Sequence, residues 1–479
     1  MRTPRMTSGT PRALSQSQTM EPEHIRFGGG ATETMLNPLV AVGMAIVIAL
    51  ILISRRNKGI TPFLLACFSI PVGQVIVLGG LHFTVLRVLI MAGLVRRATL
   101  GGSSSVGRFP GGFSRLDLWV VLWTISALVV LSLQWMNSQA LTHNLGDFLD
   151  AFGGYLVIRF FIPDGEAVRR AIWTLAIVCF IQGAFMLNEL VTHVNVFSYL
   201  GGAAFTMRDG KVRSQGVMGC IYAGALAGAL VPVFLSLWNE KKYRPVVYAG
   251  VAGALAMVGT SNSSTSLLAL AGSVLGLGLW PLRRQMQLVR RGFALTLVAL
   301  HLVMHGPVWS LIARVDLTGS SSGYHRYYLV DNCIRHFSDW WLLGYKDYNL
   351  WGWDMWDLCN QFVEVALTGG LLTLILYIAI FKRGFSVLGT ARKQVEGECA
   401  REWFLWCLAS ALFSVVVSYF GINCTQVMMM GIFTVLACIS VAVYEACPAT
   451  ASLVETAAEA PLVNAGGPAA ARASAPAIR

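Results

Sequence analysis

The sequence predicts an all-α, polytopic integral membrane protein with about 12–13 transmembrane helices and a large loop between two late spans. Of 479 residues, 55% are hydrophobic and only 13% are charged. An ordinary soluble domain carries about 25% charged residues. The apolar residues form long runs and do not alternate with polar ones, which disfavours a transmembrane β-barrel. The same composition excludes a disordered chain, a coiled coil and a small disulfide scaffold.

Three regions follow one another along the chain. Residues 1–35 are polar and lack an apolar face, so we expect a disordered N-terminal tail. Residues 36–445 are expected to form the transmembrane helical domain, and residues 446–479, rich in Ala and Pro, a disordered cytoplasmic tail. No cleavable signal peptide is predicted, because the first apolar run starts behind a long polar lead.

The apolar runs set the expected helices, because about 20 apolar residues cross a bilayer as a helix. The runs at 81–95 and 292–304 are shorter than the others. The expected spans are 38–54, 61–79, 81–95, 117–134, 146–162, 171–189, 215–237, 246–260, 266–281, 292–304, 361–381, 403–421 and 427–445.

The basic residues orient these spans. Clusters such as Arg55, Arg56 and Lys58 fall in alternate loops. Since Lys and Arg favour cytoplasmic loops, these loops are assigned to the cytoplasm. Loops 190–214 and 305–360 then lie on the outer, periplasmic side. The net charge of +12 is therefore ascribed to topology, and nucleic acid is not expected as a partner.

The outer loop 305–360 is long and rich in aromatic residues, so we expect it to be folded and to lie at the membrane interface. Cys333 and Cys359 both fall in it. An oxidising compartment would permit a disulfide between them, although free thiols are the favoured expectation. The aromatic residues are Trp309, Trp340, Trp341, Trp351, Trp353, Trp356, Tyr324, Tyr327, Tyr328, Tyr345 and Tyr348.

Several basic side chains lie on the outer side, against the general charge bias. The planar guanidinium suits phosphate oxygens, so these residues indicate an anionic headgroup as partner. For any single arginine, snorkelling or a salt bridge with a loop aspartate is the favoured alternative. The basic residues are Arg208, Lys211, Arg213, Arg326 and Arg335. The loop aspartates are Asp209, Asp331 and Asp339.

Candidate acids and bases lie in or beside the same loop. Glu364 is one turn into a predicted span, where an ionisable group is a functional candidate by default, unless it pairs with an arginine of the bundle. Asp357 and Asn360 share a face if helical, but both types are also common helix N-caps. For His325, a bystander role at the interface is favoured over that of a base. The other candidates are Asp331, His336, Asp339 and Asp354.

For the remaining polar features, structural roles are favoured over functional ones. The turn 260–266 reads Thr-Ser-Asn-Ser-Ser-Thr-Ser, and hydroxyls that cap the next helix are favoured over a hydroxyl-lined wall of a site. Arg87 and Arg159 are expected to snorkel to the cytoplasmic side. The sequence has no P-loop, Rossmann, HExxH or GxSxG motif, so neither ATP-driven transport nor metal-dependent hydrolysis has support.

Taken in order, the outer motifs resemble those of bacterial O-antigen ligases and O-antigen polymerases. The resemblance covers roughly residues 200–385 by motif, and the whole chain by the layout of its spans. The similar motifs are Arg213-Ser-Gln-Gly-Val-Met-Gly219, Gly323-Tyr-His-Arg326, Trp341-Leu-Leu-Gly344, Asp357-Leu-Cys-Asn360 and Gly369-Gly370.

Three features depart from the family's pattern. In the loop, the usual glycine pair is reduced to Gly344 followed by Tyr345. The turn 260–266 lacks the arginine usual there, and Cys359 stands where many members have histidine. Asp357, His325 and Glu364 are therefore the candidates for the catalytic base.

The resemblance implies a multi-pass glycosyltransferase of the bacterial inner membrane, with its active site facing the periplasm. It would transfer or polymerise glycan from an undecaprenyl-type polyprenyl-diphosphate carrier in cell-envelope or exopolysaccharide biosynthesis. Neither a cofactor nor a metal is implied. The implied partners are the lipid-linked saccharide donor, a glycan or lipid acceptor, membrane lipids and other polysaccharide-assembly proteins.

Residue roles follow from this implied chemistry. The departing diphosphate develops negative charge, which fixed guanidinium groups would stabilise. Arg213 and Arg326 are the expected diphosphate clamp, with Arg335 and Lys211 as reserves. Asn360, Trp341 and Tyr328 are the expected contacts to substrate or acceptor.

Two other functional classes remain open for this protein. A polysaccharide transporter or lipid flippase would place ionisable residues near the membrane midplane and often shows two related halves. Here no halves match, and the polar residues gather in one outer loop. A membrane scaffold or sensor gives no reason for outward arginines in a tryptophan-rich loop.

Overall fold

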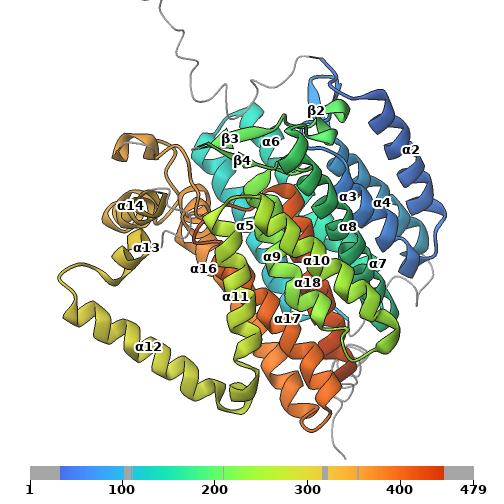
Figure 1. Cartoon of the computed structure of the whole chain (residues 1–479). Coiled ribbons are helices and arrows are strands. Elements are labelled where there is room, and N and C mark those ends of the chain that lie inside the picture. The colour runs from blue at the N-terminus through green and yellow to red at the C-terminus, as the bar shows by residue number, and fades with distance from the viewer. Residues whose placement is uncertain are drawn as a thin grey trace, which may run out of the picture.

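The computed structural model describes residues 33–446, except 102–108, 110–111, 209, 315–321 and 353–354. It is 77% helical. Within the described residues the only sheets are two antiparallel hairpins. In Figure 1 the long helices run side by side in one bundle, and α12 to α14 extend away from it on one flank. The predicted tails lie outside the described residues, apart from residues 33–35 and 446.

Within the part of the chain that the structure describes, six helical stretches are long and apolar enough to cross a membrane, which agrees with the predicted all-α membrane class. The number of 12–13 spans stays a prediction. The six are α5 (Arg115–Trp135), α8 (Gly165–Thr192), the stretch Trp280–Val303 that contains α12 (Met286–Val303), α16 (Gln361–Gln394), α17 (Cys399–Ser418) and α18 (Gln426–Ala446).

Shorter elements complete the fold. The other helices are α2 (Pro38–Ile53), α3 (Ile60–Ser69), α4 (Val85–Gly101), α6 (Ser138–Phe148), α7 (Gly154–Phe161), α9 (Cys220–Leu235), α10 (Arg244–Thr260), α11 (Ser264–Gly278), α13 (Leu311–Arg314), α14 (Ser322–Arg335) and α15 (Phe337–Trp340). The strands are β1 (Val75–Leu78), β2 (Leu81–Thr84), β3 (Thr206–Arg208) and β4 (Lys211–Arg213). Figure 1 shows both hairpins at one end of the bundle.

The predictions of a second span at 61–79 and a third span at 81–95 are wrong. Helix α3 stops at Ser69 and is only about 15 Å long. The end of the run 61–79 forms strand β1, and the start of the run 81–95 forms strand β2. The two strands pair as a hairpin. Gly79 and Gly80 both have positive φ, as a two-residue hairpin turn requires. Hydropathy alone missed the β-branched run before a Gly-Gly turn, which is a hairpin signal.

The bundle is centred on α9 and α18, whose side chains are mostly buried. Small residues let the neighbouring helices approach closely, as is usual between membrane helices. A Cβ atom added to Gly228 of α9 would lie 2.9 Å from the backbone nitrogen of Leu270 in α11. Helix α12, in contrast, has no buried residue. The core therefore holds the turn between α10 and α11 in a fixed place at the end of the bundle.

The snorkelling predicted for Arg87 and Arg159 is wrong, because both are held in ion pairs inside the bundle. Arg87 donates to both carboxylate oxygens of Asp150, at 3.1 and 2.7 Å. Arg159 is fully buried, with its Nε 3.1 Å from Asp117 Oδ1. The Tyr155 hydroxyl, one turn earlier on the same helix face, donates to the same oxygen at 2.5 Å. A carboxylate on a neighbouring segment thus holds each arginine inside the protein at the end of its own helix.

We predict that Arg159→Met destabilises the bundle by about 3–5 kcal/mol, because it leaves the buried Asp117 carboxylate without its cation. The measurement is thermal or denaturant unfolding in detergent. The matched control is Arg401→Met, whose partner Glu398 is as exposed as Arg401 itself, so the loss should stay below about 1 kcal/mol. Equal stability of the two variants would contradict the prediction.

Candidate functional site

The described residues between 305 and 360 form a folded unit on the hairpin end of the bundle, which we call the loop face. Its core contains Leu329, Trp340, Met355 and Leu358, packed against the first turns of α16. The Trp340 indole nitrogen donates to the Cys333 carbonyl oxygen at 2.7 Å. The prediction that this loop is folded is therefore confirmed for its described residues. Trp353 and Asp354 lie outside them, as does Asp209.

Arg326 extends from α14 into the end of the bundle. Arg326 is only 8% exposed. The Nη2 atom donates to the Thr265 hydroxyl oxygen at 2.8 Å, and that hydroxyl donates to the Gly421 carbonyl oxygen at 3.0 Å. These contacts join α14, the turn before α11 and the connection between α17 and α18. The hydroxyl orients the guanidinium without neutralising its charge.

Arg213 approaches the same turn from strand β4. Its Nε lies 3.5 Å from the Ser261 carbonyl oxygen. The strand is fixed there, because the Asn262 side-chain amide donates to the Val212 carbonyl oxygen at 2.6 Å. The structure thus brings together two predicted residues that lie more than 100 positions apart. Lys211, on the same strand, is exposed.

The turn 260–266 is therefore more than a helix cap. Ser263, at the N-cap position of α11, makes no side-chain capping bond, so the capping expectation is wrong there. Ser261, Thr265 and Ser266 are buried. Of these hydroxyls, that of Thr265 binds Arg326, whereas the Ser261 hydroxyl donates to the Val258 carbonyl oxygen at 2.7 Å and the Ser266 hydroxyl lies against Gly224 of α9. The less favoured interpretation, a hydroxyl-lined wall of a site, stays a prediction.

The start of α16 holds the candidate acids. Asn360 is the helix N-cap, and its Oδ1 accepts from the backbone nitrogens of Phe362 and Val363 at 3.0 and 3.2 Å. Asp357 is exposed and Glu364 is half-buried. The capping interpretation of Asn360 is confirmed, and its contact to substrate stays a prediction.

His325 stands beside this segment. Its Nε2 lies 2.9 Å from the Asp357 carbonyl oxygen. A ring nitrogen of His325, a carboxylate oxygen of Asp357 and the Cys359 sulfur all lie within 4.8 Å of one another. The three donors are of kinds that bind transition metals. Among the described residues this is the one cluster with such geometry.

Tyr222, near the start of α9, completes the site and was not expected from the sequence. Its hydroxyl donates to Asn423 Oδ1 at 2.8 Å. It interacts electrostatically with Glu364, Asp357 and Cys359. The sequence feature that could have identified this residue was a tyrosine in a span otherwise rich in Ala and Gly. The site is therefore built by six separate segments of the chain.

The glycine motifs have a structural explanation here. Gly370, with φ +69, breaks α16, and a Cβ atom there would lie 2.5 Å from the Leu342 carbonyl oxygen. The loop docks at this break, since Tyr345 N donates to the Leu367 carbonyl oxygen at 2.7 Å and Leu371 N to that of Trp341 at 2.9 Å. Close backbone approach thus requires glycine and fixes the folded loop on the bundle.

Three other predicted residues lie apart from the two arginines. Arg335 is 70% exposed at its side chain and pairs with Asp331 at 2.6 Å, as the salt-bridge alternative expected. Tyr328 stacks on Tyr324 and, two positions after Arg326 in α14, faces another way. Trp341 is exposed. The substrate contacts proposed for Tyr328 and Trp341 stay predictions, whereas for Arg335 the salt-bridge alternative is favoured over a role in the diphosphate clamp.

Cys333 and Cys359 are free thiols, as favoured from the sequence. Burial, which is the largest cause, and the Asp357 carboxylate together raise the pKa of Cys359 to about 12, although Arg326 opposes both effects. The thiol is therefore neutral near pH 7 and is not a base at the position where the related motifs have histidine.

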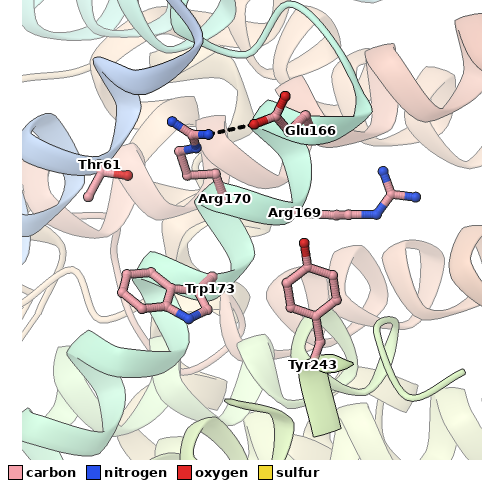
Figure 2. A pocket seen from close by; sticks show the side chains of 6 residues that line it. All are labelled: Thr61, Glu166, Arg169, Arg170, Trp173 and Tyr243. Carbon is pink, nitrogen blue, oxygen red and sulfur yellow. Dashed lines mark hydrogen bonds and ion pairs between the residues drawn. The ribbon is translucent and has the colours of Figure 1, made fainter. Parts of the chain in front are cut away.

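A cavity of about 310 Å³ lies elsewhere in the fold (Figure 2). Its arginines are already paired, Arg170 with Glu166 at 2.6 Å and Arg169 with Glu240 at 2.7 Å. Glu189, at the other end of α8, accepts from backbone nitrogens beside Arg213. Since 20 helical residues separate Arg169 from Glu189, about 30 Å separates this cavity from the loop face.

Neither a protein-family model nor a curated protein sequence matches the chain.

We predict that Cys359 resists alkylation in the folded, metal-free protein. Its raised pKa lowers the thiolate fraction at pH 7.5 on the order of 10³-fold below that of an ordinary thiol. Brief N-ethylmaleimide treatment in detergent with EDTA, followed by peptide mapping, should label the exposed Cys399 and leave Cys359 unlabelled. Labelling of Cys359 should appear on unfolding. Equal labelling of both cysteines in the folded protein would refute this.

Proposed function

We propose that this chain is a glycosyltransferase of the O-antigen ligase or polymerase type in the bacterial inner membrane. It transfers or polymerises glycan from a polyprenyl-diphosphate carrier at the loop face, which is oriented toward the periplasm in a bundle of 12–13 spans. The observation that carries the proposal is the convergence of Arg213 and Arg326 on the turn 260–266.

The two arginines fit a diphosphate. The planar fork of a guanidinium matches phosphate oxygens, and both groups are held in place before a ligand arrives. Fixed cations stabilise the charge that develops on a leaving diphosphate without having to reorganise. Thr265 orients Arg326 through a neutral hydroxyl oxygen.

The acceptor hydroxyl requires a base nearby. Its oxygen attacks the anomeric carbon, the bond from that carbon to the diphosphate oxygen breaks, and the electron pair leaves with the diphosphate. The hydroxyl proton passes to one of three groups, Asp357, His325 or Glu364. Attack opposite the leaving group inverts the anomeric centre. The aromatic side chains of the loop supply faces on which sugars stack.

A transporter or flippase is the second candidate. Ionisable groups inside a bundle often mark a transport path, and the buried pairs Arg87–Asp150 and Asp117–Arg159 are the observation that favours it. The two candidates differ in where a deletion strain accumulates lipid-linked saccharide. A transferase deletion leaves it on the periplasmic face, whereas a flippase deletion leaves it in the cytoplasmic leaflet.

We predict that Arg213→Ala and Arg326→Ala each lower polymer formation by about 10²–10³-fold, the range for loss of one charge-stabilising group. Arg326→Lys should also be strongly impaired, because a point charge does not reproduce a bidentate fork. Polymer is measured in membranes at matched protein levels, and thermal unfolding identifies variants that fail to fold.

The matched control is Arg335→Ala. It removes another arginine of α14, but one that is exposed and paired with Asp331, so polymer should stay near the wild-type level. Wild-type polymer in a folded Arg326→Ala protein, or an equal loss in the control, would refute the clamp.

A further inference from the structure

We infer that the loop face carries a binding site for a divalent transition-metal ion of the zinc type, formed by His325, Asp357 and Cys359. Their donor atoms lie within 4.8 Å of one another, although they come from two separate segments of the chain. The inference rests on this geometry and does not depend on the proposed transferase activity.

The donor set selects the class of metal. Zinc binds histidine nitrogen, cysteine sulfur and carboxylate oxygen, usually as four ligands in a tetrahedron. Magnesium and calcium prefer oxygen donors, so an imidazole and a thiol disfavour them. Three protein ligands leave one position for water or another ligand, as in zinc sites that are not purely structural.

The segments that carry the ligands are well anchored. His325 is near the start of α14, and its Nε2 lies 2.9 Å from the Asp357 carbonyl oxygen. Contact between an imidazole nitrogen and a backbone carbonyl is the usual means of orienting a ligating histidine. Between the other two ligands, Leu358 is buried in the loop core. The Cys359 nitrogen also donates to the Asp357 carbonyl oxygen at 2.9 Å.

The charges balance when a metal binds. The Cys359 thiol loses its proton to solvent, and a sulfur–metal bond replaces the sulfur–hydrogen bond. The thiolate and the Asp357 carboxylate together offset the two positive charges of the ion. The fixed charge of Arg326, which interacts with Cys359, then faces a locally neutral group. A loaded site would also leave Glu364 as the one candidate base outside the metal ligands.

The test is direct metal binding to the full-length protein in detergent, purified with a tag free of histidine and stripped with EDTA. Titration with Co²⁺ should produce a thiolate-to-cobalt absorption band, and Zn²⁺ should abolish it. Elemental analysis after zinc loading and gel filtration should give about one equivalent of zinc. Cys359→Ser should lose the band, and His325→Gln or Asp357→Asn should weaken binding by at least about 10-fold.

Cys333→Ser is the matched control, because Cys333 is another free thiol of the same loop and lies outside the cluster. Its band should equal that of the wild type, and unfolding midpoints of the metal-free variants confirm that each is folded. The inference is overturned by the absence of a thiolate band in the wild type. Retention of wild-type affinity in folded Cys359→Ser, or an equal loss in Cys333→Ser, overturns it as well. None of these results bears on the arginine clamp, whose test measures polymer.

Discussion

The arrangement of the loop face depends on one buried contact, between the Arg326 guanidinium and the Thr265 hydroxyl. A buried cation is costly unless polar atoms surround it. The bundle supplies such an atom because Thr265 is itself fixed by the Gly421 carbonyl oxygen. This contact ties the folded loop to the end of the bundle and sets where a ligand's negative charge would lie. Arg213 reaches the same turn and extends the positive region.

The same constraint operates at two other places, where Asp150 and Asp117 each hold an arginine. An unpaired charge would be unfavourable there, because Arg159 and both carboxylates are buried. The partners differ between these places. Carboxylates hold Arg87 and Arg159, whereas Thr265 gives Arg326 a neutral oxygen. A hydroxyl orients a cation without offsetting its charge.

Much of this was readable from the sequence, and the exceptions share a physical cause. Long apolar runs located α5, α8 and α16 to α18, because span length is fixed by bilayer thickness. The β1–β2 hairpin was missed because hydropathy does not distinguish a strand from a helix in a short apolar run. Arg213, Arg326 and the turn 260–266 were each noticed, but their meeting depends on helix packing that no local pattern encodes. Tyr222 and the Asp117–Arg159 pair were missed for that reason.

The account's central claim is that Arg213 and Arg326 together hold a lipid-linked diphosphate, and binding tests it without requiring the acceptor. Native mass spectrometry of the purified protein with undecaprenyl diphosphate should show a one-to-one complex. Undecaprenol, which lacks the two phosphates, should bind much more weakly. The Arg213→Ala/Arg326→Ala double variant should lose this preference while Arg335→Ala keeps it. Equal binding of the diphosphate and the alcohol by the wild-type protein, or an unchanged preference in the folded double variant, would contradict the claim.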